Sequence, residues 1–376
     1  MKLAVPKETR AHEKRVAASP ETVKKFKALG LDVVVQEGAG AGARIPDAHY
    51  AEAGATIAAS MAETLKDAEI VLKVQRPTAE ELALIKRGAM LVAILAPYAD
   101  KDSVKAYAAA GVDSFAMEFM PRITRAQSMD VLSSQANLAG YKAVIDAASQ
   151  YSRAMPMMMT AAGTVAPARV MVFGAGVAGL QAIATARRLG AIVSATDVRP
   201  AAKEQVESLG GTFVAVIDDE FKQAETAAGY AKPMSAEYQK KQAALIAETI
   251  KKQDIAICTA LIPGRPAPVL ISEEMVKTMK PGSIIVDLAV EQGGNCPLSK
   301  PGEVAEAFGV TLMGHLNVPS RIATDSTSLY AKNLFNFLSP LIEKGGKALT
   351  IKWDDEIITG TCLTRGGEVV HAALKG

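Results

Sequence analysis

Cysteine and histidine are scarce in this chain of 376 residues. Its three cysteines, Cys258, Cys296 and Cys362, are far apart and odd in number, which fits neither a disulfide framework nor the spacing of a metal site. We therefore expect no bound metal and a cytoplasmic location. The four histidines leave few candidates for a general acid or base near neutral pH.

The chain also lacks an excess of either charge and a long hydrophobic run. Forty-two Lys and Arg residues against forty Asp and Glu residues give a net charge of +2, so no broad field attracts phosphate backbones or anionic lipid. A membrane span needs about 18 apolar residues in succession, and no such run occurs. The opening MKLAVPKETR lacks the apolar core of a secretion signal. These absences predict a protein that is not exported, does not insert into the membrane and does not bind nucleic acid.

Short apolar runs alternate with amphipathic stretches, a pattern typical of α/β proteins with parallel sheets. The first series of predicted strands covers 2–5, 32–36, 69–74, 90–95 and 113–119, with helical segments such as 19–29 between them. The second series covers 168–173, 191–197, 212–216, 254–259, 283–288 and the neighbourhood of 310–314. Six strands suit a complete dinucleotide-binding sheet.

Two long helical stretches, roughly 133–152 and 325–343, bracket the second series. They predict an NAD-binding Rossmann domain over 133–324, inserted in a discontinuous outer Rossmann-like domain formed by 1–132 and 325–376. The tail should pack back on the outer domain through β-like segments near 348–353, 357–361 and 368–370. We expect the apolar side chains of Met155, Met157, Met158 and Met159 to pack at the inter-domain junction.

The glycine pattern GxGxxG directly follows the predicted strand 168–173 and opens a predicted helix. Gly174 can make the tight turn, Gly176 lets the backbone approach a pyrophosphate, and Gly179 lets helix and strand pack closely. The helix N-terminus offers unpaired N–H groups to phosphates. We therefore assign nucleotide contacts to Gly174, Ala175, Gly176, Val177 and Gly179.

Asp197 ends the next strand, at about the distance from the glycine turn expected for an acid that hydrogen-bonds the adenosine ribose. A carboxylate there would repel a 2′-phosphate, which favours NAD over NADP. Arg199, two residues later, could instead receive a phosphate. An ordinary glycine turn beside a surface Asp is the alternative.

Collinear segments make the chain resemble the soluble NAD(H)-binding α subunits of the proton-translocating nicotinamide nucleotide transhydrogenases, a family itself similar to the alanine dehydrogenases. The segments are 120–144 (MPRITRAQSMDVLSSQANLAGYKAV), 160–186, ATDVRP, AAGYAKPM, TALIPGRPAP and DLAVEQGGNCPLS. The resemblance runs from about residue 2 to residue 374.

The resemblance implies a role for a loop before the first long helix. In the family an Arg, a Gln, an Asp and a Ser there hold the dihydronicotinamide, and these roles fall on Arg122, Gln127, Asp130 and Ser133. A surface loop with a salt bridge is the alternative that the residues alone leave open.

Further nucleotide contacts follow from the same resemblance. They fall on Val198 beside Asp197 and Arg199, on Gly229 and Tyr230, on Gln242, and on Leu261. Gly229 and Tyr230 lie in 218–234, a segment without a convincing strand pattern whose length predicts a functional loop. In the family this loop closes over bound nucleotide.

The alanine dehydrogenases suggest a second function. Their carboxylate-binding Arg and Lys match Arg15 and Lys73, but their catalytic His falls at Ala96 and their catalytic Asp at Glu291. Reduction of an imine needs a proton donor, whereas direct hydride transfer between two nicotinamides does not. The vacated His position therefore favours transhydrogenation.

The family resemblance thus predicts an NAD(H)-binding subunit that exchanges hydride with NADP(H) held on a partner subunit. A membrane-embedded proton-channel subunit, a homodimer and a peripheral position on the inner membrane are implied with it. A chain that ends at Gly376 without a membrane segment suggests a split subunit, although a truncated protein would look the same. An amino-acid dehydrogenase and a non-catalytic NAD(H)-binding regulatory module are the alternatives.

Overall fold

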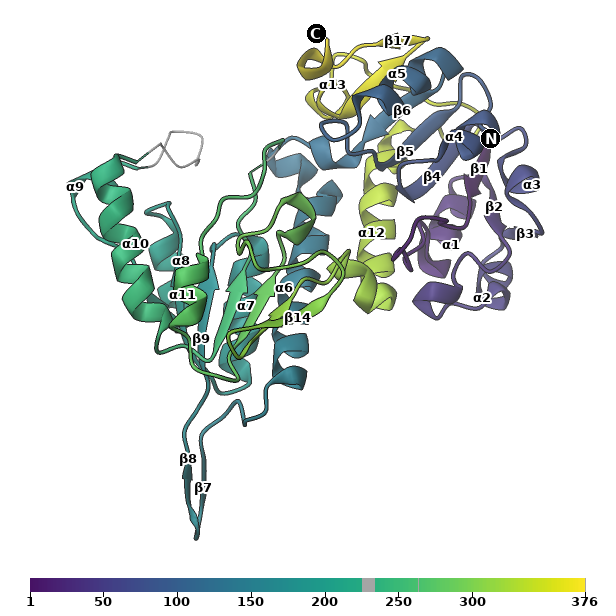
Figure 1. Cartoon of the computed structure of the whole chain (residues 1–376). Helices are drawn as coiled ribbons and strands as arrows, with labels where there is room; N and C mark the ends of the chain where they lie inside the picture. The colour runs from purple at the N-terminus through teal and green to yellow at the C-terminus, as the bar shows by residue number, and fades with distance from the viewer. Residues whose placement is uncertain (225–233, 263, 376) are drawn as a thin grey trace. The chain divides into compact units, whose positions relative to one another are not determined.

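The computed structural model describes residues 1–224, 234–262 and 264–375, which form two compact units (Figure 1). Unit 1 comprises Met1–Gln135 and Pro319–Gly376, and unit 2 comprises Ala136–Val318. The sequence analysis predicts domain boundaries at 132/133 and 324/325. Within the described residues, no helix is long and apolar enough to cross a bilayer.

Unit 1 is built on an eight-stranded sheet in the order β17-β16-β6-β5-β4-β1-β2-β3. Its strands are β1 (Lys2–Val5), β2 (Asp32–Gln36), β3 (Thr56–Ala58), β4 (Ile70–Gln75), β5 (Met90–Ile94), β6 (Asp113–Ala116), β16 (Cys362–Arg365) and β17 (Glu368–Val369). The first six are parallel, while β16 pairs antiparallel with β6 and with β17. The tail therefore completes the sheet of unit 1.

Helices cover both faces of this sheet because successive strand residues point to opposite sides. The helices are α1 (Pro20–Ala28), α2 (Asp47–Glu52), α3 (Met61–Leu65), α4 (Ala79–Ala83), α5 (Lys101–Ala110), α12 (Ala323–Leu338) and α13 (Glu356–Thr361). Phe26 of α1 and Phe337 of α12 share one buried core with Val92, while Tyr107 of α5 packs with Leu91 in the other. Ser19 caps α1 through a capping box, within the segment 19–29 that the sequence predicts to be helical.

Unit 2 is a doubly wound sheet in the order β11-β10-β9-β12-β13-β15-β14. Its strands are β9 (Arg169–Phe173), β10 (Ile192–Thr196), β11 (Thr212–Phe213), β12 (Ile255–Cys258), β13 (Ile284–Asp287), β14 (Val304–Ala307) and β15 (Val310–Met313). Counted along the six parallel strands, this is the 3-2-1-4-5-6 order of dinucleotide-binding folds. All six predicted strands are confirmed, and β14 is an antiparallel addition.

The helices of unit 2 are α7 (Val177–Arg188), α8 (Ala202–Ser208), α9 (Asp219–Lys222), α10 (Ala236–Ile250) and α11 (Glu273–Lys277), together with most of α6 (Val131–Gln150). Side chains of α6 and α7 fill one core, which contains Val144 and Ile183, and those of α10 and α11 fill the other, which contains Ile246 and Val276. Both units are thus three-layered α/β structures.

Several sequence expectations about local structure are wrong. Segment 348–353 forms no strand and contributes only an isolated bridge, between Leu349 and Ile342. Segment 357–361 forms α13 and not a strand, because Asp355 caps a helix there through the Ile357 amide. Residues 219–222 of the expected loop form α9, capped by Asp218. Met157, Met158 and Met159 are not packed: they are 59%, 44% and 76% exposed in and beside the hairpin β7 (Met158–Thr160) and β8 (Gly163–Val165), which extends from the sheet of unit 2 (Figure 1). Met155 is buried in a core of unit 2.

Candidate functional site

The glycine turn of unit 2 joins β9 to α7 at the carboxyl edge of the sheet. Gly174 adopts a left-handed φ of 94°, which favours glycine. A Cβ on Gly179 would lie 1.8 Å from the Gly174 carbonyl oxygen, so the helix can approach the strand only without a side chain there. Thr259 fixes the turn from β12 by donating to the Phe173 and Gly174 carbonyls, each at 3.0 Å.

Gly176 differs from these two glycines. Its backbone is extended, and a Cβ would meet no described protein atom within 4 Å. The packing of the protein therefore does not require a glycine at this position. Its bare backbone, at the N-terminus of the twelve-residue helix α7, fits close approach by an anionic group such as a pyrophosphate.

Asp197 lies at the end of β10, next to the glycine turn. Its carboxylate accepts a hydrogen bond from the Ala175 amide at 2.8 Å. It also accepts from Nε and Nη2 of the Arg199 guanidinium, each at 3.0 Å. The Asp197 side chain is only 7% exposed, whereas Arg199 is 32% exposed. The pair therefore places a carboxylate where the ribose of a dinucleotide would be recognised, and this carboxylate neutralises the charge of Arg199.

The remaining sequence-predicted contacts of unit 2 fall into three groups. Val177, Val198 and Leu261 are apolar and exposed by 42%, 55% and 46% around the turn and the strand ends, as contacts for a base or sugar would be. Gln242 of α10 instead joins strand ends, donating to Thr196 Oγ1 at 3.1 Å and accepting from the Val216 amide at 2.8 Å. Gly229 and Tyr230 lie outside the described residues.

Gly140 of α6 is a residue of this site that sequence reasoning missed. A Cβ there would lie 2.0 Å from the carbonyl oxygen of Ala178, in the first turn of α7. The close approach of α6 therefore supports the helix that follows the glycine turn. A glycine inside a long helix costs about 1 kcal/mol, and that anomaly was the available signal.

The loop 122–133 of unit 1, which we call the 122–133 loop, contains the other set of predicted residues. It includes the 3-10 turn η3 (Thr124–Met129) and leads into α6. Arg122 and Gln127 are exposed. Asp130 accepts from the backbone amide of Ser133 at 2.9 Å and from its hydroxyl at 2.5 Å, an arrangement that caps α6. These two residues thus have a structural role whatever else they bind.

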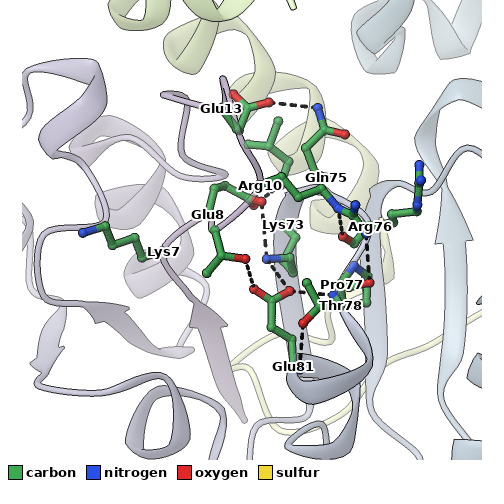
Figure 2. A network of polar contacts seen from close by, with 12 residues as sticks. Lys7, Glu8, Arg10, Glu13, Lys73, Gln75, Arg76, Pro77, Thr78 and Glu81 are labelled. Carbon is green, nitrogen blue, oxygen red and sulfur yellow. Dashed lines mark hydrogen bonds and ion pairs between the residues drawn. The ribbon is translucent and has the colours of Figure 1, made fainter.

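Unit 1 has its own switch point, between β1 and β4, where doubly wound sheets commonly bind ligands. A buried polar network fills it (Figure 2). Lys73 Nζ lies 3.3 Å from Glu8 Oε2 and 3.1 Å from Glu81 Oε2, and the lysine side chain is 2% exposed. No glycine turn follows β1, and the first helix begins only at Pro20. Unit 2, not unit 1, therefore has the features of a dinucleotide site.

Arg15 and Lys73, which match the carboxylate-binding residues of the alanine dehydrogenases, are both paired with glutamates inside unit 1. Lys73 is held between two glutamates, and Arg15 donates to both carboxylate oxygens of Glu13, at 2.8 and 2.6 Å. Arg15 is 3% exposed and also donates to Gln135 at 2.8 Å. The charges of both cations are balanced by glutamates inside unit 1.

Ala96 and Glu291 occupy the positions of the catalytic His and Asp of the alanine dehydrogenases. Ala96 has a φ of 50°, and its amide donates to the carboxylate of Glu118, whose pKa is raised by burial. Glu291 Oε2 accepts from the backbone amide of Asn317 at 3.1 Å. His315, one of the four histidines, is half-buried and lies two residues before Asn317. Ala96 cannot donate a proton from its side chain.

The fold and the glycine turn define a dinucleotide-binding protein of the doubly wound α/β class. The chain belongs to the alanine dehydrogenase/PNT family: residues 4–139 match the model of its N-terminal domain and residues 143–372 that of its C-terminal domain. Membership of this family implies NAD(H) binding.

The chain is more similar in sequence to transhydrogenase subunits than to alanine dehydrogenases. The chain is 60% identical to the first part of the NAD(P) transhydrogenase subunit alpha of Rhodospirillum rubrum, over 100% of this chain and 99% of that one. The solved structure of a transhydrogenase from Sinorhizobium meliloti matches with a TM-score of 0.90 and 57% identity, over 98% of this chain and 100% of that one. An alanine dehydrogenase of Halomonas elongata is 32% identical, over 100% and 96%.

Proposed function

We propose that this chain is the NAD(H)-binding component of a proton-translocating transhydrogenase, active with a separate NADP(H)-binding subunit. The observation that carries the proposal is the full-length likeness to transhydrogenase subunits, joined to a nucleotide turn whose Gly176 is not required by protein packing. A membrane-embedded proton-channel subunit, a homodimer and a peripheral place on the inner membrane belong to the same proposal.

The nicotinamide group supplies the hydride when NADH is bound. In this proposal Asp197 binds the adenosine ribose, and the N-terminal amides of α7 bind the pyrophosphate. Arg122, Gln127 and Asp130 orient the dihydronicotinamide so that one ring face is offered to the acceptor. No side chain needs to donate a proton, which agrees with alanine at position 96.

The proposal is tested by mixing the purified chain with an NADP(H)-binding transhydrogenase subunit and following reduction of an NAD analogue by NADPH. We expect reduction to depend on both proteins. Tight NADH binding without hydride transfer would overturn the transhydrogenase assignment and favour a regulatory module. Oxidation of NADH by pyruvate and ammonium, without the partner, would indicate an amino-acid dehydrogenase instead.

Replacing Gln127 with Asn separates orientation from binding. The shorter amide keeps its chemistry but is withdrawn by one methylene, so we expect hydride transfer to fall more than NADH affinity. The measurements are single-turnover transfer and NADH titration by nucleotide fluorescence. Equal losses of rate and affinity would mean that Gln127 only binds.

A further inference from the structure

Two asparagines of α12 converge on one backbone carbonyl of the 122–133 loop. Asn333 Nδ2 donates to the Ser128 carbonyl at 2.9 Å, and Asn336 Nδ2 donates to the same oxygen at 3.0 Å. The two residues are three positions apart, so they share one face of the helix. Both α12 and this carbonyl belong to unit 1.

Asn333 also connects to the other end of the loop. Its Oδ1 accepts from the Ser134 hydroxyl at 2.7 Å, in the first turn of α6. The Asn333 side chain is 7% exposed, so its amide has lost most contact with water and is satisfied by these protein partners. One buried amide thus bridges the two chain segments that flank Met129 and Asp130.

The carbonyl at Ser128 is well placed to set the direction of the loop. It follows Gln127 directly and precedes Asp130 by two residues. The intervening backbone is a 3-10 turn, whose own hydrogen bonds have poorer geometry than those of an α-helix. The orientation of η3 therefore depends on contacts from outside the turn.

A second anchor holds the same loop independently. Arg125 forms two parallel hydrogen bonds of 2.9 Å to Asp355, just before α13, and Ala126 is buried. Loss of the asparagine contacts should therefore leave the loop attached while freeing the Gln127 end to change direction.

We propose that Asn333 and Asn336 are positioning residues for hydride transfer: by holding the Ser128 carbonyl, they fix the direction in which Gln127 meets the nicotinamide. This inference rests on the proposed function, because it assigns the asparagines a role through Gln127. They act on the rate of transfer and not on the affinity for NADH.

The test compares Asn336→Ala, Asn336→Asp and the double variant Asn333→Ala/Asn336→Ala with the parent chain. Asn336→Asp keeps the shape but has no N–H to donate, so it should lose as much as the alanine variant. The control is Lys332→Ala. Lys332 also lies on α12, and this variant removes its ion pair of 3.1 Å with Glu21 of α1. Measurements are NADH titration, single-turnover transfer with the NADP(H)-binding subunit, and fluorescence of Trp353, the single tryptophan.

We expect hydride transfer to fall by about tenfold or more in the double variant, since small displacements of reacting groups have effects of this size. NADH affinity should stay within about threefold, as expected for an interaction that orients rather than binds. Trp353 emission and the control variant should be unchanged.

Two results would overturn the inference: an unchanged transfer rate, or a parallel loss of affinity, rate and the native Trp353 signal in Asn336→Ala. If the double variant does not fold, the half-buried Asn336 variants decide alone. Absence of transfer in the parent chain would instead refute the proposed function, and the positioning role with it.

Discussion

The carboxylate of Asp197 accepts four hydrogen bonds, one from Ala175 and three from Arg199. The Ala175 bond ties the carboxylate to the glycine turn, one Arg199 bond comes from the backbone amide, and the other two place the guanidinium against the carboxylate. A ribose hydroxyl that reaches this carboxylate must share it with Arg199. The same pairing withholds the arginine charge from a 2′-phosphate, which gives the residue pair a physical basis for coenzyme choice.

Asp197→Asn should therefore change the preference between the two coenzymes. The amide keeps one acceptor but loses the charge that neutralises Arg199, so NADH binding should weaken by about tenfold while NADPH binding strengthens. Fluorescence titration with both nucleotides measures the ratio. Glu248→Gln, which alters a 72% exposed carboxylate of the same unit, is the control. An unchanged ratio in Asp197→Asn would argue against this pairing as the basis of selection.

Residues of the site were predictable where they are neighbours in sequence. Gly174 to Gly179 and Asp197 follow from a local strand–turn–helix pattern. Gly140 and the asparagines Asn333 and Asn336 were not found, because their partners lie far away: Asn333 is 205 residues from Ser128. Such contacts exist only after the sheet of unit 1 has brought α12 beside η3.

Elements were predictable where apolar runs were long. All six parallel strands of unit 2 were predicted from the sequence, whereas the three-residue β3 of unit 1 and the antiparallel β14 of unit 2 were missed. Segment 357–361 contains the β-branched residues of a strand pattern, yet Asp355 caps a helix that begins at Glu356. Capping and packing outweigh intrinsic preference there.

The β9–α7 turn offers a comparison between two glycines of one element. In Gly179→Ala the added methyl would lie 1.8 Å from a carbonyl oxygen, so we expect a loss of about 1–3 kcal/mol of unfolding free energy. In Gly176→Ala the methyl meets no described protein atom, so stability should be retained while NADH affinity falls. Urea unfolding and NADH titration measure the two effects. Retained NADH affinity in Gly176→Ala would contradict the pyrophosphate contact.

The network that joins β1, β4 and α4 should make stability depend on pH in two opposite ways. Burial raises the pKa of Glu8, while the charge of Lys73 and the hydrogen bond from the Val74 amide lower it. The effect of burial is the larger, so the pKa of Glu8 is raised. For Glu81, burial also raises the pKa, but Lys73 and the hydrogen bond from Thr9 outweigh it and the pKa is lowered. Folding thus favours the protonated form of Glu8 and the charged form of Glu81, each relative to the unfolded chain.

The sign of each effect follows from linkage. The contribution of Glu8 is complete below its unfolded pKa of about 4.3 and is lost as pH rises through the higher folded value. Glu8→Gln should therefore lose less stability than the parent as pH rises. Glu81→Gln has the opposite sense, because the parent alone loses stability as pH falls. Urea unfolding across pH measures both, and identical pH profiles for parent and Glu8→Gln would exclude this role.

At the scale of the whole molecule, the two units share one topology but differ at their switch points. Unit 2 has a glycine turn, an open Gly176 and a carboxylate there, whereas unit 1 has Lys73 between two glutamates. The sequence predicted that the nucleotide site lies in the second domain, because the glycine motif occurs only there. It could not show that unit 1 fills its own switch point, because Glu8 and Lys73 are 65 positions apart.

The division of the proposed nucleotide contacts between the units predicts different responses to NADH and ADP. Trp353 reports unit 1, since it stacks 3.8 Å from the Arg365 guanidinium and packs near Phe115. Ligand at 100 times its Kd stabilises its binding unit by about 2.7 kcal/mol. NADH, which reaches the 122–133 loop in our proposal, should raise the denaturation midpoint of Trp353 fluorescence as well as that of far-UV circular dichroism. ADP, which lacks the nicotinamide, should raise chiefly the latter. Equal effects of the two ligands on Trp353 would contradict a separate nicotinamide contact on unit 1.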